Sequence, residues 1–141
     1  MKIARISTVM FFLRTQLKKQ IDDLVNFGCD VTIIANEDDF EDKSAKLENV
    51  KTINLDIKRK ISPLNDIKTI FALIKIFKRE KFDIVHSTTP KAGLLVAIAA
   101  WIVKVPIRLH TFTGQPWIVE KGFKKFLLKS SPPLIFFIFF I

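Results

Sequence analysis

Glycine, cysteine and tyrosine are scarce or absent in this chain of 141 residues, which has four glycines, one cysteine and no tyrosine. The first apolar segment ends at Thr8, and the loop that follows it contains no glycine. The glycine-rich fingerprint by which many dinucleotide-binding domains hold their cofactor is therefore missing there, and the P-loop pattern is missing as well. We expect no cofactor bound through either motif.

The single cysteine, Cys29, cannot form a disulfide within the chain, which fits a reducing cytoplasm. The histidines His86 and His110 each end an apolar segment, but no third ligand accompanies them, so a metal site is not expected. The apolar run Ala92–Val103 is shorter than the roughly 20 residues that span a bilayer. No signal-peptide cleavage pattern follows the apolar residues Val9–Leu13. We therefore expect a cytoplasmic protein.

The formal net charge of +9 is distributed unevenly along the chain. Residues 1–60 carry 11 Lys/Arg and 10 Asp/Glu, whereas residues 61–141 carry 12 Lys/Arg and 4 Asp/Glu. A positive second half favours anionic lipid headgroups, phosphorylated substrates or nucleic acid as partners, and a simple solvated basic surface is the alternative. Nucleic acid ranks last, because no recognisable binding module and no alternation of basic and aromatic residues is present.

Apolar segments of strand length alternate with segments of helical periodicity. The expected strands are Lys2–Thr8, Asp30–Ala35, Val50–Leu55, Phe82–Val85 and Ile107–Thr111. The expected helices are Thr15–Phe27, one that begins at Pro63, Pro90–Val103 and Lys121–Lys129. This order predicts an α/β domain over residues 1–130, with a mainly parallel sheet flanked by helices on both faces.

Polar residues follow two of the expected strands. One group is Ser87–Gly93, and the other begins at His110. Such loops meet at the carboxyl edge of a parallel sheet, where ligands bind in open α/β folds. Thr89 and Pro90 suit the first positions of a helix, so an anion site with Lys91 as a mobile charge and an ordinary capped helix start both remain open.

Three stretches together resemble a known family. They are Ile61–Asp66, Asp83–Leu95 and Val105–Trp117, the last two containing Thr-Pro-Lys-Ala-Gly-Leu-Leu and His-Thr-Phe-Thr-Gly-Gln. They resemble the N-terminal half of bacterial family-4 glycosyltransferases that build polysaccharide or O-antigen by adding sugars to polyprenyl-diphosphate-linked acceptors. The similarity extends over roughly residues 1–130.

The resemblance implies the N-terminal half of a GT-B fold, in which two Rossmann-like domains face each other across a cleft. In that family the N-terminal domain holds the acceptor, and the C-terminal domain holds a nucleotide-sugar that serves as co-substrate. Transfer retains the anomeric configuration and needs no metal. The implied partners of the full-length enzyme are the nucleotide-sugar, the lipid-linked glycan and an anionic membrane that it contacts peripherally, at the inner face of the cell membrane.

Site residues follow from the resemblance by position. The expected acceptor-binding residues are Thr8, Thr89, Lys91, Gly93, Thr111 and Gly114. The catalytic residue is not identified, and the candidates are His110 and Thr113. Thr113 stands where many relatives have a histidine, which is a departure from the family pattern, and His110 precedes it by three residues.

Residues 131–141 form an apolar tail that departs from the resemblance. One interpretation is a shift of reading frame near Ser130, and the other is a genuine tail that touches a membrane; the lack of helical amphipathic spacing favours the first. A donor domain is not among these 141 residues, so the chain alone is expected to be inactive. The alternative function is a non-catalytic binding module that docks on anionic lipid or on a separately encoded donor domain.

Overall fold

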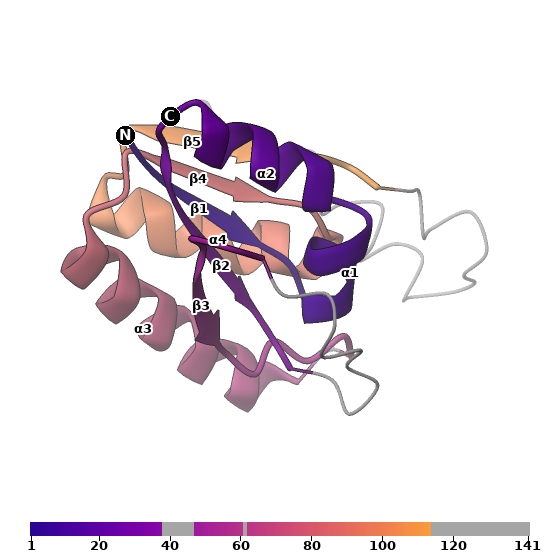
Figure 1. Ribbon diagram of the computed structural model, residues 1–141. Helices are drawn as coiled ribbons and strands as arrows, with labels where there is room; N and C mark the ends of the chain where they lie inside the picture. The colour runs from indigo at the N-terminus through magenta and orange to yellow at the C-terminus, as the bar shows by residue number, and fades with distance from the viewer. Residues whose placement is uncertain (38–46, 61, 114–141) are drawn as a thin grey trace.

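The computed structural model describes residues 1–37, 47–60 and 62–113, and it shows one five-stranded sheet with helices on both faces (Figure 1). The strands are β1 Lys2–Ile6, β2 Asp30–Ala35, β3 Lys51–Asn54, β4 Ile84–Ser87 and β5 Ile107–His110. Their order across the sheet is β3-β2-β1-β4-β5, and every neighbouring pair is parallel. All five carboxyl ends therefore meet at one edge of the sheet.

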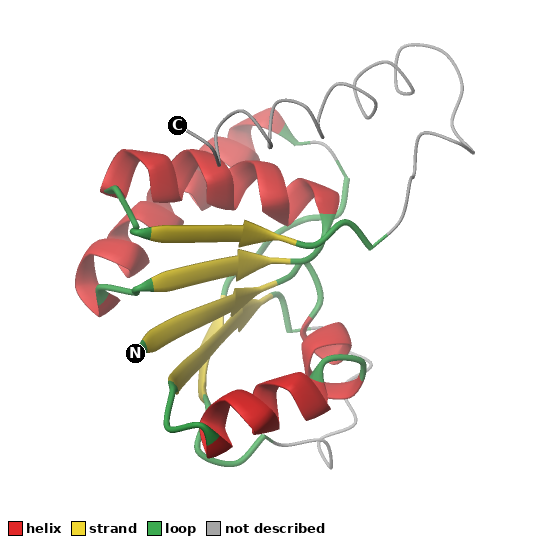
Figure 2. Ribbon diagram, turned by 90° about the horizontal axis from the view of Figure 1, so that it is seen from above, coloured by secondary structure: helices red, strands yellow, loops and turns green. Residues whose placement is uncertain are grey.

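Four helices connect the described strands. They are α1 Met10–Thr15, α2 Lys18–Asn26, α3 Pro63–Glu80 and α4 Pro90–Val103. Helices α3 and α4 cover one face of the sheet, and α1 and α2 cover the other, as the view from above shows (Figure 2). The connection from β1 to β2 contains α1 and α2, whereas the connections from β3 to β4 and from β4 to β5 contain α3 and α4. These two sets of connections run in opposite directions across the sheet. Because parallel connections are right-handed, they place their helices on opposite faces.

The alternation of side chains along the strands divides the core into two apolar clusters. Ala4 and Ile6 face α3 and α4, where they pack with Leu73 and Phe77. The cluster on the opposite face joins α1 and α2 to the second strand and contains Met10, Leu13, Ile21, Val31, Ile33 and Ala35. Small residues on α4 bring its backbone close to the sheet, because most of its buried positions are alanines. The two clusters hold the sheet rigid beneath the loops at its carboxyl edge.

The expected α/β class and parallel sheet are confirmed, and β2 and α4 have the expected bounds. The helix expected over Thr15–Phe27 is present as α2, which begins three residues later, at Lys18, and ends at Asn26. The preceding helix α1, in which Met10 and Leu13 are fully buried, was not expected. The segments expected at Lys121–Lys129 and 131–141 lie outside the described residues. Among the described helices, none has the length and apolar content to span a membrane.

Candidate functional site

Three loops meet at the carboxyl edge of β1, β4 and β5, and hydrogen bonds join them. The backbone N–H of Thr8, after β1, donates to Oγ1 of Thr89 before α4 over 3.3 Å. The hydroxyl of Thr113, after β5, donates to the carbonyl of Thr88 over 3.0 Å. The buried Thr88 hydroxyl in turn donates to the carbonyl of Ile6 over 3.3 Å. These bonds fix the relative positions of loops that are far apart in the sequence.

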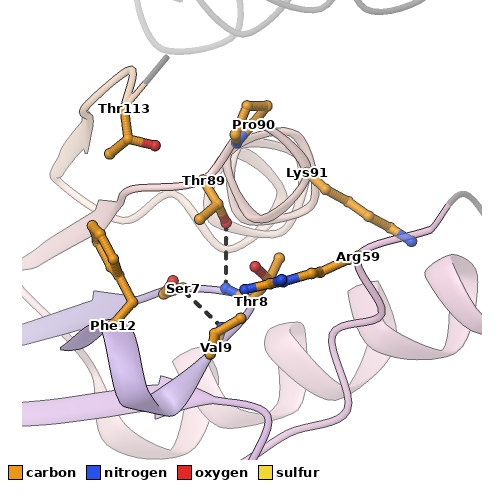
Figure 3. A pocket seen from close by; sticks show the side chains of 9 residues that line it. All are labelled: Ser7, Thr8, Val9, Phe12, Arg59, Thr89, Pro90, Lys91 and Thr113. Carbon is orange, nitrogen blue, oxygen red and sulfur yellow. Dashed lines mark hydrogen bonds between the residues drawn. The ribbon is translucent and has the colours of Figure 1, made fainter. Parts of the chain in front are cut away.

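A pocket of about 350 Å³ opens between these loops (Figure 3). The residues that line it are Ser7, Thr8, Val9, Phe12, Arg59, Thr89, Pro90, Lys91 and Thr113. Four residues expected from the sequence therefore come together: Thr8, Thr89, Lys91 and Thr113. Hydroxyl groups and cations line the pocket together with the apolar side chains of Val9, Phe12 and Pro90, and none of the described residues that line it carries a carboxylate. The polar part of this lining suits an anionic or hydroxyl-rich ligand.

Helix α4 begins at this pocket with Pro90 at its first position. Thr89 occupies the N-cap position, as the sequence indicates, but its hydroxyl makes no capping bond to the helix. It accepts the Thr8 N–H instead and so ties the β1 loop to the β4 loop. The first turn of α4 has no acidic residue, which leaves the positive end of the helix dipole uncompensated on that turn.

The expectation that Lys91 is a mobile charge is wrong. Its Nζ lies 2.7 Å from Oδ1 of Asp66 on α3, and both side chains are less than one-fifth exposed. The same Nζ donates to the backbone carbonyl of Lys60. Lys91 therefore belongs to a half-buried ion pair that connects the start of α4 with the start of α3.

Gly93 and His110 contact each other on the α4 side of the sheet and do not line the pocket. A Cβ atom at position 93 would lie 2.4 Å from Cε1 of His110, so the imidazole occupies the space that a larger residue would need. The Ser87 hydroxyl lies 2.8 Å from Nδ1 of His110, and Phe112 packs edge-to-face on the ring. Burial lowers the pKa of His110, and the backbone of Ser87 opposes that effect. The histidine is a packed, neutral group at pH 7.

A second series of hydrogen-bonded polar side chains lies on the opposite face of the sheet. Nη1 of the buried Arg5 donates to Nδ1 of His86 over 2.9 Å, and Nη2 donates to Gln20. Because an arginine can only donate, Nδ1 accepts and the His86 proton resides on Nε2, which donates to Oγ1 of Thr111 over 2.8 Å. Burial, followed by the charges of Arg5 and His110, lowers the pKa of His86 to about 4. Thr111 is thus held by His86 outside the pocket.

The basic residues 58–60 are not among the site residues expected from the sequence, but they lie at the site. Arg59 lines the pocket, and it also lines an adjoining hollow of about 510 Å³ with Lys58, Lys60, Asn36 and Asp56. The signal was their position directly after a strand, since β3 ends at Asn54 on the same edge. Gly114 lies outside the described residues. Within the described ranges, no group of three or more Asp, Glu, His or Cys side chains could hold a metal ion.

A family profile and two curated relatives point to the same family. The profile described as "Glycosyl transferase 4-like" matches residues 5–134. The capsular polysaccharide biosynthesis glycosyltransferase CapM of Staphylococcus aureus is 36% identical over 112 residues, which are 79% of this chain and 29% of that protein. The UDP-Gal:alpha-D-GlcNAc-diphosphoundecaprenol alpha-1,3-galactosyltransferase of Escherichia coli is 35% identical over 100 residues, which are 68% of this chain and 25% of that protein.

Solved structures show the same fold. The crystal structure of MurG from Acinetobacter baumannii superimposes with a TM-score of 0.62 at 19% identity, covering 92% of this chain and 39% of that one. The chain thus spans between a quarter and two-fifths of the length of the proteins it matches. Its parallel Rossmann-like sheet, its polar carboxyl edge and the profile match over residues 5–134 show that it belongs to the glycosyl transferase 4-like family.

Proposed function

We propose that this chain is the acceptor-binding domain of a retaining GT-B glycosyltransferase. The reaction would move a sugar from a nucleotide-sugar to a polyprenyl-diphosphate-linked glycan during polysaccharide synthesis. The observation that carries this proposal is the pocket at the carboxyl edge, lined by Thr8, Thr89 and Thr113. All three lie within the stretch that matches the family profile. The E. coli relative supports the acceptor class, since its name specifies a diphosphoundecaprenol-linked sugar.

The nucleotide-sugar donor would bind to a second domain, as in the GT-B enzymes that this chain resembles. Positioning of two substrates against each other supplies a large part of catalysis in group transfer. We therefore expect the 141-residue chain to bind an acceptor but to transfer no sugar by itself. His110 would support the β5 loop through its packing on Gly93 and would not touch the transferred sugar. The reaction would use the nucleotide-sugar as co-substrate, without a cofactor or metal.

A surface of exposed apolar and basic side chains on α3 supports peripheral contact with anionic lipid. Leu64, Ile67 and Phe71 recur at helical spacing and are 80%, 53% and 61% exposed. Lys68 and Lys75 lie on the same helix and are also exposed. Exposed apolar side chains flanked by lysines are typical of helices that lie in the headgroup region of a membrane. This surface would bring the pocket near a lipid-linked acceptor at the inner face of the cell membrane.

The same surface supports the second candidate function, a non-catalytic module that docks on anionic lipid or on a separate donor domain. Sugar transfer distinguishes the two. The chain is mixed with the separately produced remainder of the CapM relative, a radiolabelled nucleotide-sugar and a polyprenyl-diphosphate-linked sugar. If radiolabel appears in the lipid fraction only when both proteins and the acceptor are present, the result supports the glycosyltransferase function. Vesicle binding by the chain, with neither acceptor binding nor transfer in the mixture, supports the module.

A further inference from the structure

The ion pair of Lys91 removes the obvious cation from the candidates for binding a ligand. Its Nζ is 2.7 Å from Asp66 and also donates to the carbonyl of Lys60. Withdrawing it toward a ligand would leave the Asp66 carboxylate, which is only 18% exposed, without its counter-charge. Leaving a buried charged group unsatisfied costs more than the pair itself contributes. Lys91 is therefore a structural cation, although it lies at the pocket.

The contacts of Lys91 fix the loop between β3 and α3. Near the start of this loop, Ile57 is buried in the core. The carbonyl of Asp56 lies 3.2 Å from the Thr69 hydroxyl, whose one hydrogen is shared with the carbonyl of Asn65 at 2.8 Å. Near its end, Lys91 binds the carbonyl of Lys60. Arg59 lies between these anchors, so its backbone is held in place while its side chain is exposed.

Arg59 lines the same pocket as Lys91 but is not held in an ion pair with any residue that the structure describes. Its side chain runs across the pocket toward Thr8 (Figure 3). Among the described residues it has no hydrogen-bond or ion-pair partner, so its donors are available. The planar guanidinium presents paired N–H groups that match two oxygens of a phosphate, which a lysine ammonium cannot do.

We propose that Arg59 binds the diphosphate of the acceptor and that Lys91, through Asp66 and Lys60, positions the Arg59 loop. This inference rests on the proposed function for the identity of the ligand, and it places the diphosphate between Arg59 and the loop that contains Thr8. A diphosphate also occurs in nucleotide-sugars and as the free anion, so the experiment includes all three sources.

The experiment measures binding of farnesyl diphosphate, inorganic diphosphate and UDP-N-acetylglucosamine to the full chain by calorimetry. Farnesyl diphosphate binds most tightly, because the lipid-linked ester is the acceptor-like compound. Arg59→Gln weakens its binding about tenfold or more, the effect of losing charge-assisted hydrogen bonds. Arg59→Lys restores only part of the affinity. Lys78→Gln, an exposed cation at the far end of α3, leaves it unchanged.

The role of Lys91 is tested with the double variant Lys91→Met/Asp66→Asn, which removes both charges and leaves neither unpaired. It weakens farnesyl diphosphate binding about threefold by loosening the Arg59 loop. In an Arg59→Gln background the same double change has no further effect, because Lys91 acts through Arg59. Thermal unfolding of every variant confirms that each is folded.

The proposal is overturned if wild-type chain does not bind farnesyl diphosphate, or if Arg59→Gln binds it normally while Lys91→Met/Asp66→Asn does not. Tighter binding of UDP-N-acetylglucosamine would also overturn it, by assigning the site to the donor. Its failure and that of the proposed function are separable. Sugar transfer that ignores Arg59 contradicts only the residue assignment. Arg59-dependent diphosphate binding without transfer in the two-protein mixture contradicts only the glycosyltransferase.

Discussion

At the amino end of the sheet, charged groups pair with each other, whereas at the carboxyl end hydroxyl groups join loops around a pocket that has the Lys91–Asp66 ion pair beside it. Near the amino end, Lys51 of β3 and Arg79 both bind Glu80, over 2.7 and 2.8 Å. The backbone N–H of Lys2 donates to Asp83 over 2.7 Å. At the carboxyl end, the exposed Arg59 lines the pocket, and none of the described residues in that lining carries a carboxylate.

The comparison indicates that residues at the amino end of the strands contribute to stability, whereas residues that can bind a ligand lie at the carboxyl end. The parallel sheet creates this division, because every loop that follows a strand emerges at one edge and can contribute a side chain to the same site. Substitutions at the amino end are therefore expected to alter the free energy of unfolding only. Substitutions at the carboxyl end are expected to alter it and, where they touch the pocket, ligand binding as well.

The largest expected effect is that of Gly93→Ala at the carboxyl end. The new methyl group would lie 2.4 Å from the His110 ring, which Ser87 and Phe112 hold in place. Overpacking of this kind lowers the free energy of unfolding by about 2 kcal/mol. Urea denaturation measures it. In a His110→Ala background the loss should largely disappear, and an equal loss in both backgrounds would show that the ring is not the obstacle.

A smaller effect concerns the pH dependence caused by His86. Its pKa is lowered from 6.5 to about 4, so between these values the unfolded chain binds a proton that the folded chain excludes. Stability should therefore fall as the pH drops from 6.5 toward 4. The contribution is about 1 to 2 kcal/mol, after discounting for the solvent that reaches the ring. Chemical denaturation across this range should give a shallower pH slope for His86→Gln, and parallel slopes would contradict the assignment.

Gly28 provides a matched contrast to Gly93 at the other end of the sheet. It precedes β2 with a φ of +79°, and a Cβ there would meet no atom within 4 Å. The cost of Gly28→Ala is conformational and should be about 1 kcal/mol. Gly28→Asn should cost less, since asparagine tolerates positive φ better than alanine. Denaturation midpoints of the two variants test this order, and the reverse order would indicate a steric cause.

The smallest expected effect is that of Glu80→Gln at the amino end. Hydrogen bonds from Lys51 and then Arg79 lower the pKa of the Glu80 carboxyl, so its contribution is present at neutral pH and is lost in acid, below its usual value of 4.5. Surface pairs contribute about 0.5 kcal/mol and weaken with salt. Denaturation in low and high salt should show the loss only in low salt. A change in farnesyl diphosphate binding would contradict the separation of the two ends.

Much of the fold could be predicted because local signals mark it. Asp30–Ala35 is a short apolar run after a glycine, and Pro63 and Pro90 both stand at the first position of a helix. Helix α1 was missed because Arg14 interrupts its apolar residues, although Met10 and Leu13 have the i, i+3 spacing of a buried face. That segment is helical because its apolar side chains are buried against the rest of the fold, which a short stretch of sequence does not reveal.

Strand topology predicted only that loops after the strands would meet at one edge, whereas Thr8, Thr89 and Thr113 were named from the family resemblance. The structure brings these three residues together at the pocket. The ion pair of Lys91 could not be predicted, since its partner Asp66 lies 25 positions away on another helix and no local spacing links the two residues. In the proposed arrangement the same long-range pair positions the Arg59 loop, so the error about Lys91 and the omission of Arg59 have one cause.

The most direct test of the account is where an acceptor analogue contacts the chain. In a ¹⁵N-labelled sample titrated with farnesyl diphosphate, the account predicts that amide shifts are concentrated at Thr8, Arg59 and Thr89, on the loops of the carboxyl edge. Shifts concentrated at Lys2, Lys51 or Asp83, at the amino end, would contradict the claim that this edge binds the acceptor.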